Sequence, residues 1–260
     1  MKVELLNKDE IKKLYENHGL FACGCYATPD KYAKKVGESC QESEHMSGSR
    51  CEYFKFRIYD VDRGTAEQIM RHEVGVKVPF EDQDNYYFGD VIDINPSNIV
   101  KNMASFRYID KDGFTYTTPK NIEKCEEAKH YYDMLMEEIN SKRRLIKKCL
   151  EENGVEPKKA TEDVNFVLPR ATNSMLTIGF TPEALISFMH KRLCTRAQDE
   201  VRAVAIAMKK AVSEVLPEWT DKNLVANCKH LLYCPEGSMC CKIAPTKEQL
   251  VKILAEKGLK

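Results

Sequence analysis

The chain has 260 residues, of which 43% are hydrophobic and 31% charged, so it can bury a core and a wholly disordered chain is excluded. Its 40 basic and 40 acidic residues cancel, which argues against a dedicated partner of nucleic-acid polymers. No apolar run approaches the roughly 18–20 residues of a membrane span, and the N-terminus lacks the apolar stretch of a secretory signal, so we expect a cytoplasmic protein without membrane contact.

The N-terminal part is predicted to contain helices and one clear strand. Residues 8–20 have the apolar spacing of a short amphipathic helix. Residues 21–28 favour a short strand or the edge between a strand and a loop, and 29–50 favour helix fragments and loop. Residues 51–60 alternate with period two, which predicts a strand with one buried face. Residues 62–72 are predicted to form a helix whose first residue, an aspartate, can cap it.

The C-terminal half is predicted to be mostly helical. Residues 121–152 have the spacing of a long charged helix that Gly154 can terminate, and 164–170 form a short segment that reaches a proline. Thr181 and the proline after it are typical of a helix start, and the helical pattern runs to Leu216 with a break near Cys194. Together the elements predict an α+β fold, in which long helices pack on a mostly antiparallel sheet.

Nothing in the sequence marks a domain boundary before about residue 218. We therefore predict one domain over 1–217 and a cysteine-rich tail over 218–260. Residues 74–101 are acidic, aromatic and irregular, which is typical of an insertion that forms a long loop or a small hairpin.

Three segments combine arginine with other polar residues. On a helix, Gln68 shares a face with Arg71 and His72, and in an extended segment Ser105 and Arg107 project to the same side. Each cluster alone is also compatible with solvated surface arginines, and the adjacent His72-Glu73 pair does not suit a metal. Together they suggest an anionic ligand, because a guanidinium offers two parallel donors to a phosphate or a nucleobase edge. The segments are residues 68–73, 102–108 and 192–202.

The order and spacing of these segments resemble the flavin-dependent thymidylate synthases over most of residues 20–217. Arg71-His72 matches the start of the family's Arg-His-Arg triplet. The run Asn102-Met103-Ala104-Ser105-Phe106-Arg107-Tyr108 matches its Asn-x-x-Ser-x-Arg-Tyr ending. Further downstream, the stretch from Arg192 to Arg202 carries the Arg, the Ala-Gln, the Glu and the final Arg of the family's C-terminal part. Two more matches are His45-Met46-Ser47 and Val167-Leu168-Pro169.

The chain also departs from that family. Glu73 stands where the triplet ends in Arg, and 31 residues in place of seven lie between Glu73 and Ser105. Asn165 stands where many members have an Arg that contacts the nucleotide, and Arg196 stands where His is common. Two positions that often hold Asn facing the flavin are here Thr181 and Ser187.

The resemblance implies conversion of dUMP to dTMP, with methylenetetrahydrofolate as carbon donor and FAD, reduced by NADPH, as the source of hydride. It also implies a homotetramer with active sites at subunit interfaces. Arg192 would stabilise negative charge at the N3/O2 edge of the uracil, and Ser105 would position the nucleotide. The implied substrate contacts are Gln68, Arg71, Ser105, Phe106, Arg107 and Arg192. The implied FAD contacts are His45, Ser47, Arg71, His72, Asn102, Thr181 and Ser187.

Two alternative functions stay open at this point. One keeps the flavin and the pyrimidine nucleotide but ends in another C5 modification, such as hydroxymethylation. The other is a non-catalytic nucleotide-binding homologue that uses the tail as a contact surface. In that tail, the spacings between cysteines are either looser or tighter than those of ordinary zinc sites, which favours reduced thiols over a structural metal. The candidate ligands for a metal there are Cys228, Cys234, Cys240 and Cys241.

Overall fold

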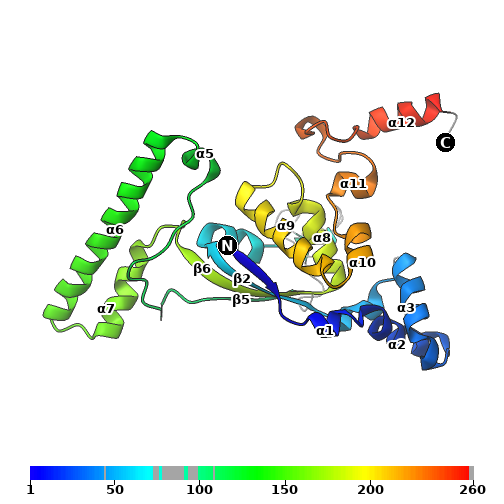
Figure 1. Cartoon of the computed structure of the whole chain (residues 1–260), viewed down its shortest axis with the longest axis horizontal. Coiled ribbons are helices and arrows are strands. Elements are labelled where there is room, and N and C mark those ends of the chain that lie inside the picture. The colour runs from blue at the N-terminus through cyan, green and yellow to red at the C-terminus, as the bar shows by residue number, and fades with distance from the viewer. Residues whose placement is uncertain (44, 73–75, 78–90, 93–98, 108, 258–260) are drawn as a thin grey trace, which may run out of the picture. The chain divides into compact units, whose positions relative to one another are not determined.

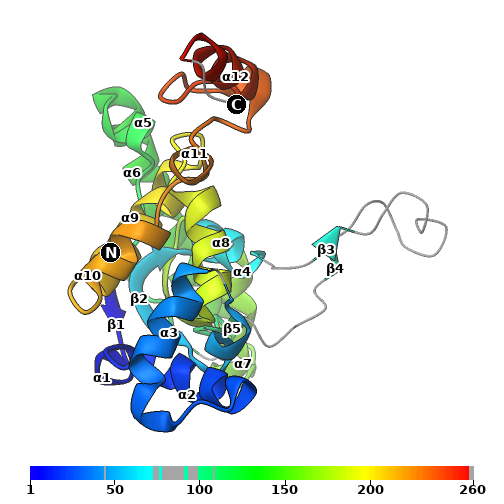
Figure 2. The same ribbon diagram turned by 90° about the vertical axis from the view of Figure 1, so that its right-hand side faces the viewer.

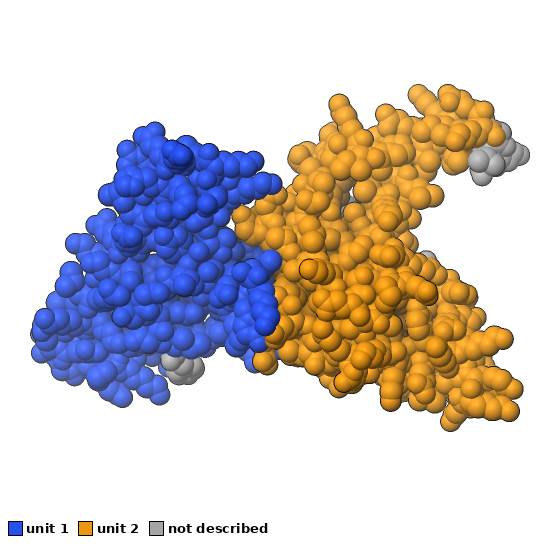
Figure 3. Space-filling view, in the orientation of Figure 1, with its two compact units in different colours: residues 1–2, 58–70, 102–177 blue, residues 3–57, 71–101, 178–260 orange. Residues whose placement is uncertain are grey.

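A computed structural model describes residues 1–43, 45–72, 76–77, 91–92, 99–107 and 109–257 of the chain. The chain forms two compact units, which are coloured separately in Figure 3. Unit 1 comprises residues 1–2, 58–70 and 102–177, and unit 2 comprises 3–57, 71–101 and 178–260.

A four-stranded antiparallel sheet has the strand order β1-β2-β6-β5, and helices make up most of the remaining structure, which confirms the predicted α+β class (Figure 1). The boundary between the units falls inside each of these four strands. The strands are β1 (Lys2–Leu5), β2 (Phe54–Asp62), β5 (Ile99–Met103) and β6 (Asn173–Phe180).

Strand β2 confirms the strand predicted from the period-two pattern. Phe54, Phe56 and Ile58 are fully buried, and the alternate side chains between them are not. In unit 2, the Phe54 ring stacks on Trp219 with a centroid distance of 5.0 Å. In unit 1, the carboxylate of Asp62 accepts a hydrogen bond from the Thr65 amide at 2.8 Å, as the predicted cap requires.

Unit 1 contains helix α4 (Arg63–Met70) and a group of helices after β5. The helix predicted over 121–152 is confirmed from Glu126 to Glu152, whereas the residues before it form a separate short helix. Gly154 lies two residues beyond the end, and its φ of +84° suits a residue without a side chain. Sequence analysis missed α7, which packs beside α6 in Figure 1 and ends in a turn of 3-10 helix, η5. These later elements are α5 (Lys120–Glu123), α6 (Glu126–Glu152), α7 (Pro157–Val164) and η5 (Asn165–Val167).

The strand predicted for 21–28 is wrong, because these residues largely continue helix α2. The helix packs against α3 through two glycines: a Cβ on Gly19 would lie 1.7 Å from the Ala33 carbonyl oxygen, and a Cβ on Gly37 would lie 1.8 Å from that of Tyr15. This tertiary contact, rather than local propensity, explains the helix. The N-terminal helices of unit 2 are α1 (Lys8–Ile11), α2 (Leu14–Tyr26), η1 (Asp30–Tyr32), α3 (Ala33–Glu42) and η2 (Ser47–Cys51).

The C-terminal part of unit 2 confirms two helices with a break near Cys194. The Thr181 hydroxyl accepts a hydrogen bond from the Ala184 amide and caps the first helix. None of the described helices is both long and apolar enough to cross a membrane. The elements are α8 (Pro182–Arg192), α9 (Asp199–Ser213), α10 (Pro217–Asn223), α11 (Asn227–Leu231), η6 (Gly237–Met239) and α12 (Lys247–Glu256).

The predicted insertion over 74–101 contains two short strands, β3 (Val76–Lys77) and β4 (Val91–Ile92), which pair antiparallel (Figure 2). This pairing agrees with the small hairpin. The end of the range was predicted as irregular, but it is the start of β5, at Ile99. Glu73 and the other residues of the range lie outside the described part of the chain.

Candidate active site

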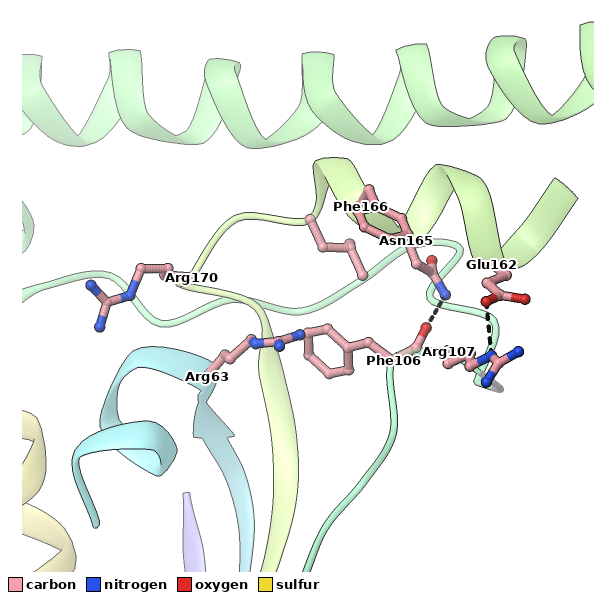
Figure 4. A pocket seen from close by; sticks show the side chains of 8 residues that line it. Arg63, Phe106, Arg107, Glu162, Asn165, Phe166 and Arg170 are labelled. Atoms are coloured by element: carbon pink, nitrogen blue, oxygen red, sulfur yellow. Dashed lines mark hydrogen bonds and ion pairs between the residues drawn. The ribbon is translucent and has the colours of Figure 1, made fainter. Parts of the chain in front are cut away.

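Unit 1 contains a cavity of about 340 Å³ that is rich in arginine (Figure 4). Phe106 and Arg107, both predicted substrate contacts, lie in its wall. The three guanidinium groups come from the start of α4, from the turn after β5 and from the segment before β6. The lining residues are Arg63, Phe106, Arg107, Glu162, Asn165, Phe166, Leu168 and Arg170.

Carboxylates hold the guanidinium groups of this cavity. Nε of Arg107 lies 2.8 Å from a Glu162 oxygen. Glu67, on α4, pairs with Arg63 at 3.0 Å and with Arg170 at 3.8 Å. These ion pairs restrain three side chains whose exposed fractions are between 39 and 73%, so the cations are oriented and still open to solvent.

Aromatic rings complete the cavity. The guanidinium carbon of Arg63 lies 4.9 Å from the centroid of the Phe106 ring, and Lys111 Nζ lies 5.0 Å from the same ring. The Phe166 side chain is 86% exposed, which is unusual for so large an apolar group. Arginines beside aromatic faces suit a ligand with an anionic group and a flat ring, as in a nucleotide.

The extended segment in which Ser105 and Arg107 would project to the same side is not formed beyond the end of β5. Strand β5 ends at Met103, and Phe106 and Arg107 lie in a turn. The Ser105 hydroxyl accepts a hydrogen bond from the Arg107 amide at 3.2 Å, a local bond that competes with strand geometry. Ser105 therefore shapes the turn that carries Arg107, and its own side chain is exposed.

The other predicted residues of unit 1 do not line this cavity. Gln68 is half-buried on α4, and Asn102 is exposed near the end of β5. Asn165 lines the cavity, but its side-chain amide donates to the backbone carbonyl oxygens of Phe106 and Ile109. Sequence analysis missed Arg63, Glu162 and Arg170. The last of these directly follows the Val-Leu-Pro match and could have been found there.

Unit 2 contains a smaller cavity of about 210 Å³ around Arg192, the last residue of α8. Arg192 is half-buried, and its Nε is buried without a hydrogen-bond partner among the described residues. Burial lowers the pKa of Arg192, yet a guanidinium keeps its charge near neutral pH. The lining residues are His190, Lys191, Arg192, Cys194, Arg196, Ala197, Asn227, Cys228, Pro235 and Glu236.

His72 is buried and packs against helix α8. Its ring meets the Phe188 ring edge-on at a centroid distance of 5.2 Å, and its Nε2 has no hydrogen-bond partner among the described residues. Burial, followed by the nearby charges of Lys191, Arg192 and Lys101, lowers the pKa of His72 to about 3. The imidazole is therefore neutral near pH 7. The neighbouring Arg71, another predicted contact, is exposed to solvent.

Four of the predicted flavin contacts belong to η2 and α8 or lie just before them. His45 and Ser47 are exposed at the start of η2, and Ser187 is half-buried on α8. The elements touch, and Arg50 joins them by an ion pair to Glu183 at 2.7 Å. The hydroxyl of Thr181, by contrast, is buried and serves as the helix cap.

The eleven cysteines of the chain are free thiols. Cys194 and Cys228 line the Arg192 cavity, and Cys234 is buried. Within the described ranges, no three or more His, Cys, Asp or Glu side chains form a group that could hold a metal ion.

Comparison with known proteins identifies the family. The family model described as "Thymidylate synthase complementing protein" matches residues 11–218, so the chain belongs to this family. A flavin-dependent thymidylate synthase of Nitratidesulfovibrio vulgaris is 34% identical over 82% of this chain and 77% of its own length. Proteins of the same name from Clostridium tetani and Geobacter sulfurreducens are 27% and 26% identical over 76% and 80% of this chain, and over 70% and 76% of their own lengths.

Proposed function

We propose that this protein is a flavin-dependent thymidylate synthase that converts dUMP to dTMP. The observation that carries the proposal is the arginine-rich cavity of unit 1, which is lined by Phe106 and Arg107. It occurs in a chain that belongs to the thymidylate synthase family named above. An oriented guanidinium that is exposed to solvent suits a phosphate, and the adjacent rings suit a pyrimidine nucleotide.

In this proposal Arg107 binds the nucleotide phosphate and Arg192 the N3/O2 edge of the uracil. The uracil ring must become electron-rich at C5 to take up a carbon, and a permanent cation at the opposite edge stabilises the charge that develops. The unpartnered Nε of Arg192 supports this role, because a buried donor gains most from a ligand acceptor. Ser105, Gln68 and Arg71 complete the nucleotide contacts, with Ser105 as a positioning group.

The residues of unit 2 fit a flavin. The exposed imidazole of His45 and hydroxyl of Ser47 provide polar groups for a dinucleotide, and η2 contacts α8, which carries Ser187. The Nε2 of His72, whose ring packs against Phe188 of the same helix, is unpartnered among the described residues. We assign Arg71 and Thr181 to the same role, and also Asn102, which belongs to unit 1. Bound FAD, reduced by NADPH, would supply hydride to the one-carbon unit that methylenetetrahydrofolate donates.

We further propose a cytoplasmic homotetramer whose active sites lie at subunit interfaces. Helix α6 supports self-association, because exposed apolar side chains recur along one of its faces. They are Tyr131, Met134, Leu135, Leu145 and Ile146. Light scattering on the purified protein tests the assembly, and a monomer at working concentration would contradict it.

Anaerobic turnover of dUMP with FAD, NADPH and methylenetetrahydrofolate tests the activity. We expect the mass of dTMP as product. A product heavier by one oxygen would identify hydroxymethylation instead. A protein that binds dUMP but neither binds FAD nor forms product would be a binding homologue.

A further inference from the structure

The turn that carries Arg107 is held from within unit 1 by a buried amide, that of Asn165. Its Nδ2 donates to the carbonyl oxygens of Phe106 at 2.5 Å and Ile109 at 3.0 Å, and Figure 4 shows the first of these bonds. Its Oδ1 accepts from Nη2 of Arg143 at 2.5 Å. Both amide hydrogens are therefore used inside the protein, and neither is left for a ligand.

Arg143, on α6, is only 3% exposed and continues this network. Its Nε donates to the Val164 carbonyl oxygen at 3.1 Å and its Nη1 to that of Lys111 at 2.9 Å. A buried guanidinium is tolerated where its donors find such acceptors. The side chain thereby joins α6 to two other segments, the turn after β5 and the end of α7.

Three anchored carbonyl groups lie on both sides of Arg107 in the chain, at Phe106, Ile109 and Lys111. The backbone position of Arg107 therefore depends on the Arg143–Asn165 pair. Asn165 stands where the sequence resemblance places an arginine that contacts the nucleotide. In this protein Asn165 bonds to the backbone of the turn, and the guanidinium of Arg143 on α6 donates to its side-chain oxygen.

We propose that Arg143 and Asn165 are positioning residues, which fix the backbone at 106–107 and 109–111 so that Arg107 is oriented for the phosphate of the nucleotide. This inference rests on the proposed function. A donor held in place before binding loses less conformational freedom when the ligand arrives, so a loosened turn lowers affinity without removing any contact.

The test compares Arg143→Met with wild type in the full-length, FAD-loaded protein. We expect the peptide over 104–112 to exchange its amide hydrogens about tenfold faster, and dUMP to bind about tenfold more weakly by calorimetry. In an Arg107→Ala background the same change should alter the dUMP affinity less than about twofold, because its effect acts through Arg107.

Arg144→Met is the matched control. This neighbouring arginine bonds to Asp112 at 2.5 Å, but the two side chains are 59% and 58% exposed, so their loss should change neither exchange nor affinity. Asn165→Asp is the alternative test variant if Arg143→Met does not fold. It keeps the acceptor for Arg143 and loses both donors to the turn.

Unchanged exchange and unchanged affinity in a folded variant would overturn the proposal. An equal loss of affinity with and without Arg107 would also overturn it, because the pair would then act elsewhere. If wild type binds no dUMP, the proposed function fails, and hydrogen exchange alone decides whether the pair anchors the turn.

Discussion

The charged side chains of the two cavities differ in their burial and in whether they have interaction partners. In unit 1, the arginines are exposed and each is paired with a carboxylate, as Arg107 is with Glu162. In the cavity of unit 2, the Nε of Arg192 is buried and unpartnered among the described residues. A ligand of the first cavity must compete with an ion pair, whereas a ligand of the second supplies an interaction that the protein lacks.

This difference predicts a larger functional loss in unit 2. Arg192→Ala should lower kcat by about 10²–10³-fold, the usual cost of removing a preorganised charge that faces the reacting group. Anaerobic turnover measures the loss, and the flavin absorbance should show that FAD stays bound. Activity within a few-fold of wild type would refute the role of Arg192.

Arg107→Ala should weaken dUMP binding by roughly 1.5–3 kcal/mol, the scale of a lost charge-assisted hydrogen bond. Glu162→Gln should act in the opposite direction and tighten binding by about two- to fivefold, because the phosphate no longer competes with a carboxylate. Calorimetric titration with dUMP measures both changes. An unchanged affinity of Arg107→Ala for dUMP would contradict the assignment of the unit 1 cavity to the nucleotide.

His72 should make stability depend on pH. Its pKa is lowered to about 3 in the folded protein, so the unfolded chain binds the proton more readily. Stability is therefore complete above the ordinary pKa of about 6.5 and falls with decreasing pH, by at most about 1.4 kcal/mol per pH unit, until about pH 3.

Urea unfolding of wild type and His72→Phe at pH 7 and pH 5 measures this effect. The free energy of unfolding of wild type should fall by about 2 kcal/mol more than that of the variant. Parallel curves would show that His72 is not buried in its neutral form.

The smallest expected effect separates two roles of Thr181. As a helix cap, Thr181→Ala should cost about 1 kcal/mol of stability, and Thr181→Ser should restore most of it. Thermal unfolding measures this change, and flavin binding should be unaltered in both variants if the hydroxyl serves α8 alone. Weaker FAD binding in the alanine variant would support the contact that the sequence resemblance implies.

Local patterns were sufficient where one residue type decides one structural feature. The alternation around Phe54 and Phe56 predicted β2, and Asp62 and Thr181 predicted two helix starts, because a short side-chain oxygen satisfies the first free amides. Local patterns failed at 21–28, where the close approach of Gly19 to α3 favours a helix. They also failed after β5, where the Ser105 hydroxyl bonds to the Arg107 amide.

The amino-acid sequence by itself determined the family, the α+β class and the arginine-bearing segments, since these depend on the order and spacing of residues along the chain. Only the tertiary structure decided that Phe106 and Arg107 share a cavity with Arg63, Glu162 and Arg170, and that Arg143 supports their turn. Burial and hydrogen bonding join residues far apart in the chain, and no local spacing encodes which carbonyl a buried guanidinium will meet.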